Sequence, residues 1–478
     1  MLTTLAAPAF AGTWYIEDGD ITVKAGETEG TNKVSQGANQ EVEDTDTIIK
    51  NREDTASSNT VTIDAGSDKV EVTLQDVNIK ADSGSALTSN GDVTLTLKGE
   101  NHLTGGNGDT YGGDGITSRG SLTISGGTVT ATGGGSTGSN GLGGRGICSD
   151  SGGVTISGGS TVTANGGNGS HGGSGISSSS GVTVSDGTVT ANGGNGGNVS
   201  GDGIRSDGGV TISGGTVKAA GGDSKDGYGG DGIRSGGGVT ISGNTVNAAG
   251  GNGGKVGGYG ICSFDRVAIS GGTVEAAGGS SGSSNGGSGI YSSVIDLSGS
   301  LELTAKAGSP NGKALSQRGN ELDLDTIKDK LGPGAKVTAT DANGKVIAQV
   351  PIPRPVEPEE PVIPGESSSS SDGGSAAPSA PVSSLPGLTV TDKDGQRISY
   401  TSTQSGNALT VCVGRFTASF RASLSTLRQL RAEGIEAITF QTILCSTTLS
   451  VDELLAMGGE DAEAVLTHRL TDSSLTVG

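Results

Sequence analysis

The chain has 478 residues, which is long for one ordinary domain and favours either several domains or an elongated repeat structure. Its 91 glycines do not recur at every third position, which excludes a collagen triple helix, and short runs of Val and Ile between them favour an ordered fold. With 51 acidic and 30 basic residues the net charge is -21, which disfavours binding to nucleic acid or to anionic lipid surfaces.

Residues 1–11 have the features of a signal-peptide remnant. The segment is short and apolar and ends at Ala9-Phe10-Ala11, a pattern of small residues that signal peptidase recognises. The basic residues that normally precede it are missing, so an apolar N-terminal strand stays open as an alternative, although Pro8 fits a strand poorly. No apolar run is long enough to span a membrane. We therefore expect an extracellular or cell-surface protein.

A repeat of about 29 residues dominates the region from residue 86 to residue 308. Each copy has a Gly-Ile-x-Ser step, a Val-Thr-Ile-Ser-Gly-Gly strand, a Thr-Val-Thr-Ala strand and a tail rich in Gly and Asn. The leading isoleucines are spaced by 31, 29, 28, 29, 28 and 29 residues and are Ile116, Ile147, Ile176, Ile204, Ile233, Ile261 and Ile290. Two less regular copies precede them, which predicts about nine coils.

Apolar and polar residues alternate within each copy as they do in β-strands. Val210 and Ile212 share one face and Thr211 lies on the other, and Val217 and Ala219 flank Lys218 in the same way. Strands this short cannot bury their apolar faces alone, but stacking the coils about 4.8 Å apart aligns equivalent residues in continuous ladders. The sequence therefore predicts an all-β, right-handed parallel β-helix, a solenoid that with its N-terminal cap covers residues 12–308.

The glycine-rich tails are predicted to leave this helix at one corner and to form a loop-lined edge. A bulky residue stands five positions before most leading isoleucines, and this loop column consists of Tyr111, Leu142, His171, Val199, Tyr228, Val256 and Asn285. Two interpretations stay open. One is that the bulky side chains fold over the corner and shield the core from water. The other is that Tyr111, His171 and Tyr228 form an exposed row that contacts a ligand.

Two acidic and two basic residues occupy equivalent positions in neighbouring copies. Asp202 and Asp231 stand two residues before their leading isoleucines, and Arg205 and Arg234 stand one residue after them. These side chains either offset one another's charge at the strand ends, or Asp202 and Asp231 bind calcium together with loop carbonyls, because hard cations need several oxygen ligands. Calcium is the one cofactor that the sequence suggests. The two arginines join the Tyr and His residues of the loop column as candidate ligand-binding residues.

The opening segment Thr13-Trp14-Tyr15-Ile16-Glu17-Asp18-Gly19-Asp20-Ile21-Thr22-Val23 and the coils that follow it resemble clostridial carbohydrate-binding β-helix proteins of gut Firmicutes. The resemblance covers roughly residues 13–310. It implies a fold similar to that of polysaccharide lyases and binding to plant cell-wall polymers, in some members with calcium. No ligand-binding motif of that family can be placed here residue by residue, so the resemblance does not assign a particular polymer.

Together these features predict a secreted or cell-surface, non-catalytic protein that binds carbohydrate or mediates adhesion, with a polysaccharide as its partner. One alternative is a purely structural surface spacer, and another is a calcium-dependent polysaccharide lyase. A lyase of this architecture is expected to need clustered carboxylates and a basic residue, and only the Asp and Arg pairs described above have that composition. The three histidines, His102, His171 and His468, are scattered along the chain, and no catalytic residue is assigned.

Three further segments follow the repeats. Residues 309–350 are expected to cap the helix with a short helical segment at 322–331 and a hairpin around Asp341-Ala342-Asn343-Gly344. Residues 351–387 form a Pro/Ser-rich linker that has no potential for a packed core. Residues 388–478 are predicted to be a small α/β domain of unassigned role. It has a hairpin across Ser405-Gly406-Asn407, a helix at 424–433 and a second helix capped by Ser450.

The four cysteines do not form a disulfide framework. Cys412 and Cys445 lie in or beside predicted strands of the last domain and are a candidate disulfide. Cys148 and Cys262 occupy equivalent positions of the repeat but are separated by four coil steps, about 19 Å, which is too far for a disulfide.

Overall fold

The computed structural model describes residues 11–283, 285–351, 388–392, 397–398, 400–405, 407–413, 418–442, 446–457, 462–468 and 473–477. The chain divides into two compact units, Met1–Glu360 and Pro361–Gly478. Most of the predicted signal-peptide remnant (residues 1–10), nearly all of the predicted linker (residues 352–387) and Cys445 lie outside the described residues. The predictions for the remnant and the linker therefore stay predictions. Cys412 is a free cysteine in the structure, which argues against its predicted disulfide with Cys445.

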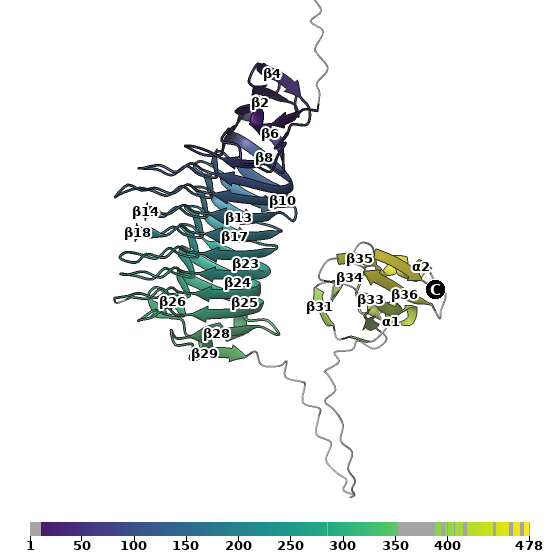
Figure 1. Ribbon diagram of the computed structural model, residues 1–478. Helices are drawn as coiled ribbons and strands as arrows, with labels where there is room; N and C mark the ends of the chain where they lie inside the picture. The colour runs from purple at the N-terminus through teal and green to yellow at the C-terminus, as the bar shows by residue number, and fades with distance from the viewer. Residues whose placement is uncertain are drawn as a thin grey trace, which may run out of the picture. The chain divides into compact units, whose positions relative to one another are not determined.

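A parallel β-helix of about 12 turns with a period of about 28 residues forms the first unit (Figure 1). A short strand begins each middle coil: β9 (Ile116–Arg119), β11 (Ile147–Ser149), β15 (Ile176–Ser178), β19 (Ile204–Ser206) and β22 (Ile233–Ser235). The second strand of a coil is β12 (Gly153–Ser157), β16 (Gly181–Val184) or β20 (Gly209–Ile212), and the third is β13 (Thr161–Asn165), β17 (Thr188–Asn192) or β21 (Thr216–Ala220).

Elsewhere two or three strands of a coil merge into one long strand that bends through a corner, and in the coils that begin with β9 and β22 the second and third strands merge in this way. These strands are β6 (Val61–Gln75), β8 (Leu87–Thr104), β10 (Leu122–Thr132), β23 (Val239–Ala249), β24 (Ile261–Ala277) and β25 (Ile290–Lys306), with the short β7 (Asn78–Lys80) beside β8. The predicted parallel β-helix is confirmed, but the predicted nine coils are too few. The count fell short because the Gly-Ile-x-Ser signature is absent from the turns at both ends, where parallel pairing continues without it.

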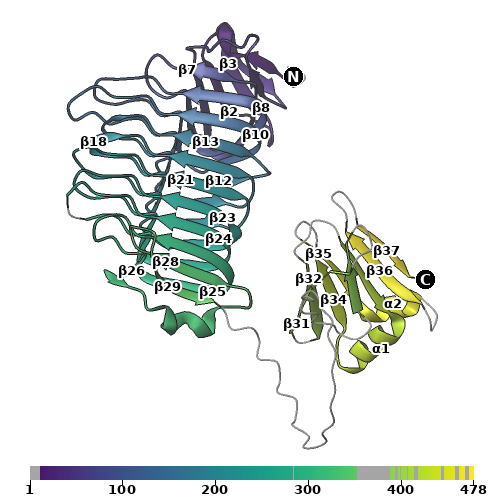
Figure 2. The ribbon, with the colours of Figure 1, turned by 60° about the horizontal axis from the view of Figure 1, so that its bottom comes forward.

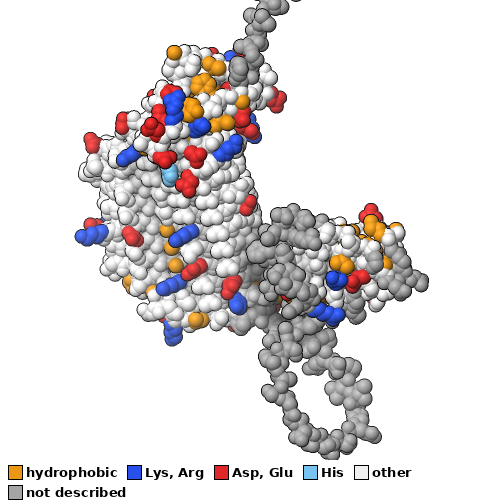
Figure 3. All heavy atoms as spheres, turned by 45° about the vertical axis from the view of Figure 1, so that its right-hand side comes forward, with side chains coloured by type: hydrophobic (Ala, Val, Ile, Leu, Met, Phe, Trp, Pro, Cys, Tyr) orange, Lys and Arg blue, Asp and Glu red, His pale blue; other side chains and the backbone are white. Residues whose placement is uncertain are grey.

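The coils stack in register, so that equivalent residues lie on top of one another. Ile147 pairs with Ile176, and Val162 with Val189, and these ladders continue through the middle coils. Each of these apolar side chains is buried, whereas Thr211 and Lys218 point outward, as the alternation predicted. Glycines with positive φ turn the corner between the second and third strands, for example Gly158 at 63°. On the face of the β-helix seen in Figure 3, acidic and basic side chains are interspersed and do not form a patch of one sign.

The serine of each Gly-Ile-x-Ser step is buried at the end of the first strand. The Ser149 hydroxyl donates to the carbonyl oxygen of Gly120 in the preceding coil at 2.8 Å. Ser178 donates in the same way to Gly152 at 2.8 Å and accepts the Gly181 N–H at 3.1 Å. The hydroxyl of Ser206, one coil further on, is buried without a hydrogen-bond partner. The same residue type therefore stabilises the corner to different extents in successive coils.

Both ends of the stack are covered by antiparallel strands (Figure 2). At the N-terminal end, β1 (Thr13–Tyr15), η1 (Ile16–Asp18), β2 (Ile21–Ala25), β3 (Asn32–Gln36), β4 (Asn39–Asp44) and β5 (Ile48–Lys50) form the cap. At the other end lie β26 (Leu315–Gln317), β27 (Asn320–Glu321), the 3-10 helix η2 (Leu324–Lys330), β28 (Lys336–Thr340) and β29 (Val346–Pro351). The predicted helical segment and hairpin are confirmed, and β28 also pairs in parallel with β25 as one more turn of the stack.

The second unit has two four-stranded sheets and two helices, which confirms a small α/β domain. One sheet contains β30 (Leu388–Thr391), β33 (Ala418–Ser423), β36 (Glu463–His468) and β37 (Ser473–Val477). The other contains β31 (Thr401–Ser405), β32 (Ala408–Cys412), β34 (Ala437–Gln441) and β35 (Ser446–Ser450). The helices are α1 (Leu424–Ala432) and α2 (Val451–Met457), and Ser450 accepts a hydrogen bond from the Glu453 N–H at the start of α2. Within the described part of the chain, no helix has the length and apolar character needed to cross a bilayer.

Replacing Ser178 by Ala is expected to lower the stability of the β-helix by about 1 kcal/mol, because two hydrogen bonds to the buried hydroxyl are lost. The matched control is Ser206→Ala, which removes a buried hydroxyl that has no partner and should leave stability unchanged or slightly raised. Urea midpoints followed by circular dichroism measure both effects. Equal losses in the two variants would contradict the assignment.

Candidate functional site

A groove of about 470 Å³ lies between the projecting loops and the short first strands of four consecutive coils. We call the stacked loops the lobe; Figure 1 shows them projecting on one side of the helix. The groove is lined by Tyr111, Gly112, Asp114, Leu142, Gly143, Gly144, Arg145, His171, Gly172, Gly173, Ser174, Ser177, Arg205 and Asp207. The loop column predicted from the sequence therefore forms one wall, and side chains beside the first strands form the floor.

The loop column is a continuous ladder of parallel bridges. Tyr111 bridges to Leu142 and Leu142 to His171; the short strands β14 (Gly169–His171) and β18 (Gly196–Val199) pair next, and Val199 bridges to Tyr228. Tyr111 is 68% exposed and Tyr228 47% exposed. Exposure of this extent argues against the interpretation that these side chains shield the core. It leaves an open row, of which Tyr111, Leu142 and His171 face the groove.

A neck of glycines joins the lobe to the helix. In each coil one row of glycines leads out from the helix to the lobe and a second row leads back. Backbone hydrogen bonds connect the two rows, alternately within one coil and between successive coils. The Gly173 N–H donates to Gly167 in its own coil at 2.9 Å, and the Gly194 N–H donates to the Gly173 carbonyl of the preceding coil at 2.8 Å. A Cβ atom on Gly173 would lie 1.9 Å from the Gly144 carbonyl oxygen, so no other residue fits there. This packing makes the wall of the groove a fixed part of the fold.

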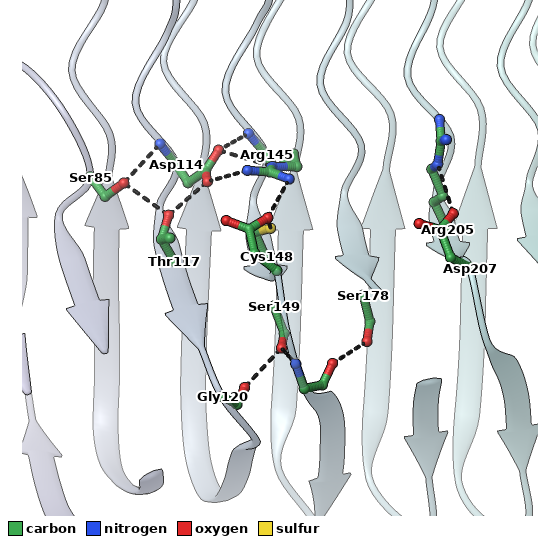
Figure 4. A network of polar contacts seen from close by, with 12 residues as sticks. Ser85, Asp114, Thr117, Gly120, Arg145, Cys148, Ser149, Ser178, Arg205 and Asp207 are labelled. Atoms are coloured by element: carbon green, nitrogen blue, oxygen red, sulfur yellow. Dashed lines mark hydrogen bonds and ion pairs between the residues drawn. The ribbon is translucent and has the colours of Figure 1, made fainter. Parts of the chain in front are cut away.

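An ionic network occupies the N-terminal part of the floor (Figure 4). The Asp114 carboxylate is buried and accepts the backbone N–H of Arg145 at 2.6 Å, an Arg145 guanidinium N–H at 3.2 Å and the Thr117 hydroxyl at 2.6 Å. Arg145 also pairs with Asp150 at 3.1 Å. Asp114 stands just before the first strand β9, and Asp150 directly follows the first strand β11. Arg145 is thereby held across the floor, with 36% of its side chain exposed.

Arg205 lies in the same groove but is much less constrained. Its one ion pair among the described residues is with Asp207, at 3.9 Å, and half of its side chain is exposed. A bound molecule could therefore pair with this guanidinium without first breaking a short ion pair. Arg234, its neighbour in the ladder, is not among the lining residues; it contacts Asp231 at 3.4 Å and the ring of Phe264 at 5.3 Å. Of the two predicted arginines, only Arg205 lines the groove.

Asp202 and Asp231 are buried beneath the surface and do not line the groove. One oxygen of Asp202 accepts the Asp231 N–H at 2.7 Å, and one oxygen of Asp231 accepts the Tyr259 N–H at 2.7 Å. Burial raises the pKa of both carboxyl groups, and repulsion from Asp202 adds to the rise for Asp231, whose pKa reaches about 7. Both residues thus have a structural role in linking successive coils.

Calcium binding at Asp202 and Asp231 stays a prediction. Within the described residues, no group of three or more His, Cys, Asp or Glu side chains is arranged to hold a metal ion. The buried thiols of Cys148 and Cys262 offer no reactive alternative, because burial raises the pKa of both well above the usual range.

The sequence reasoning did not identify Asp114 and Arg145 as a pair. Both stand two residues before a leading isoleucine, in consecutive coils, and the in-register stacking brings them together. Opposite charges at one position of neighbouring coils were the available signal. The like-charged pairs Asp202/Asp231 and Arg205/Arg234 are more conspicuous in the sequence because the same residue type recurs in consecutive copies.

A family described as "Beta helix repeat" matches residues 122–144, 154–179 and 210–233, all of which lie in the stacked coils. The chain is a parallel β-helix protein. No curated protein and no solved structure matches the sequence of this β-helix protein. The repeat match and the stacked coils agree on the fold, whereas the resemblance to carbohydrate-binding proteins of gut Firmicutes is not independently supported.

Replacing Gly173 by Ala is expected to loosen the lobe by about 1–3 kcal/mol, because the added Cβ collides with the backbone carbonyl of Gly144 in the preceding coil. Hydrogen exchange of peptides covering residues 165–203 measures the effect. Gly135→Ala is the control, since a Cβ there would lie 3.5 Å from the nearest atom. Protection that is unchanged in Gly173→Ala would show that the neck does not hold the lobe.

The raised pKa of Asp231 predicts a pH-dependent loss of stability. Because the folded state holds this proton up to about pH 7 and the unfolded state loses it near pH 4, stability falls as the pH rises through this interval. Asp231→Asn keeps an oxygen acceptor for the Tyr259 N–H but cannot ionise. This variant should be more stable than the wild type at pH 8 and equal to it at pH 4.

Thermal melts across this pH range test the prediction. The matched control is Asp226→Asn, at an exposed position on the lobe. A difference between Asp231→Asn and the wild type that does not change with pH would contradict the titration of Asp231.

Proposed function

We propose that the protein is a secreted or cell-surface carbohydrate-binding protein that holds a polysaccharide in the groove without cleaving it. The observation that carries the proposal is the row of exposed Tyr111, exposed Leu142 and half-buried His171, which faces Arg145 and Arg205 across the groove. Sugar rings have apolar C–H faces that pack on aromatic and aliphatic side chains, and hydroxyl groups that pair with charged side chains. The two sides of the groove offer these two kinds of contact.

The shape of the groove also favours a linear polymer. Its lining residues come from four successive coils, so it runs along the helix axis instead of closing around a small molecule. The glycine neck and the Asp114–Arg145 contacts hold wall and floor in place before any ligand arrives. Binding to such a fixed surface loses little conformational entropy, which compensates for weak individual contacts.

The proposal is tested by a pull-down with immobilised polygalacturonate, xylan and mixed-linkage β-glucan, with and without calcium. The wild type is expected to bind at least one polymer, and Tyr111→Ala or Arg205→Ala should weaken binding about tenfold, the equivalent of about 1.4 kcal/mol. Controls are Ile347→Ala and Lys218→Ala, which remove an exposed apolar and an exposed basic side chain outside the groove.

The outcomes separate the alternatives. Lack of binding to every polymer in both conditions would leave the structural-spacer function. Release of unsaturated products from polygalacturonate in the presence of calcium would instead indicate a lyase. Binding that requires calcium, and that is lost in Asp202→Asn, would support the predicted calcium site.

A further inference from the structure

The aromatic residues of the repeats are confined to one face. Residues 86–308 contain five, namely Tyr111, Tyr228, Tyr259, Phe264 and Tyr291. Tyr111 lines the groove and Tyr228 belongs to the same loop column. Tyr291 belongs to the ladder that contains Ser177 and Arg205, both of which line the groove, and that continues through Arg234 and Cys262. Tyr259 stands at the repeat position that Arg145 has in an earlier coil, and Phe264 stands at the repeat position of Asp207.

Three of these rings form a cluster beyond the C-terminal end of the groove. Tyr259 and Tyr291 are stacked, with ring centroids 4.9 Å apart and an angle of 20° between the planes. Phe264 is 54% exposed, and the guanidinium carbon of Arg234 lies 5.3 Å from its ring centre. We call Tyr259, Phe264, Tyr291 and Arg234 the aromatic platform. It combines exposed apolar ring surface with a cation whose position is fixed by Asp231.

We propose that the aromatic platform is a second carbohydrate subsite, so that one polysaccharide chain lies along the face from Tyr111 to Tyr291. This inference rests on the proposed function of the groove. The groove and the platform adjoin, because Arg205 at the end of the groove and Arg234 of the platform are register partners in neighbouring strands. A ring face beside a guanidinium binds the C–H face of a sugar and pairs with its hydroxyl or carboxylate groups.

A protein partner fits this platform less well. Three aromatic side chains bury about 150–250 Å² each, which is less than the roughly 800 Å² per partner of a stable protein interface. The residues at the equivalent positions of neighbouring coils are small: Gly236 in the coil before Phe264, and Cys262 and Ser316 in the coils before and after Tyr291. The apolar surface is therefore a narrow strip along the groove axis, which suits a single extended chain.

The distance between the two far ends of this face, at Tyr111 and Tyr291, sets the length of the bound segment. Tyr111 stands in the loop just before the coil of Ile116. Six register steps lead from that coil to the coil of Tyr291. At about 4.8 Å per step they span about 29 Å. An octasaccharide can reach from Tyr111 to Tyr291, whereas a trisaccharide is too short to contact both of these side chains.

The test compares these two lengths by calorimetry, using oligosaccharides of whichever polymer the pull-down retains: polygalacturonate, xylan or mixed-linkage β-glucan. Wild-type protein should bind the octasaccharide at least tenfold more tightly than the trisaccharide, because the second contact is intramolecular. In Phe264→Ala and in Tyr291→Ala this ratio should fall toward one. Phe264→Trp should keep it, as should the control Ile347→Ala.

The outcomes distinguish this inference from the proposed function. A wild type that binds the octasaccharide and loses affinity in Tyr111→Ala, but not in Phe264→Ala or Tyr291→Ala, would keep the groove and overturn the platform. A wild type that binds no polymer would overturn both. Phe264→Ala is the first choice because its exposed ring is not part of the core, and circular dichroism confirms that each variant is folded.

Discussion

Hydrogen bonds between equivalent strands of successive coils constrain everything else in the β-helix. They require that each residue lies on its counterpart from the coil before, at a fixed spacing. A ladder of Val, Ile, Leu or Ala inside the helix is the direct consequence, and the one aromatic side chain of this core cluster is Trp14 in the N-terminal cap. The same constraint acts outside, where it decides which polar side chains are neighbours. The groove is therefore specified by the same register as the core.

The glycines of the lobe follow from this constraint as well. A loop that must repeat at each coil can project far from the helix only if its strands pack as closely as the coils themselves. In the neck this leaves no space for a side chain, since the carbonyl of one coil lies where a Cβ of the next would be. The high glycine content of the sequence is thus not a sign of flexibility in this region. It produces a regular, hydrogen-bonded wall that carries the Tyr111 column.

The fold could be predicted from the sequence because its signals are local. Alternation such as Val-Thr-Ile, the recurring Gly-Ile-x-Ser step and the turn at Asp341–Gly344 each identify an element without knowledge of distant contacts. The terminal turns were missed because they keep the register but lose the signature residues. The glycine neck was predicted only as a loop edge, since hydrogen bonds between its outgoing and returning rows depend on three-dimensional packing.

The candidate site was harder to predict because one position in the repeat can have two different roles. An Asp placed two residues before a leading isoleucine gives one oxygen to the N–H of the next coil, as both Asp114 and Asp202 do. The second oxygen is then the one that makes the shorter side-chain contacts, as Asp114 shows. Its partner depends on the residue that the next coil supplies: Arg145 follows Asp114, whereas a second Asp follows Asp202. Reading one copy at a time cannot reveal this difference.

Because these contacts depend on the residue that each coil supplies, the chemical character of this face changes along the helix axis. Its floor changes from the ionic pair at Asp114 and Arg145, through uncharged Ser174 and Ser177, to the rings of Tyr259 and Tyr291. A polymer of identical units that lay along this face would meet a different surface at each coil. Because the order of these surfaces is not symmetric, the two directions of the chain would be inequivalent. A polysaccharide bound in the proposed way would therefore adopt one orientation relative to the helix axis.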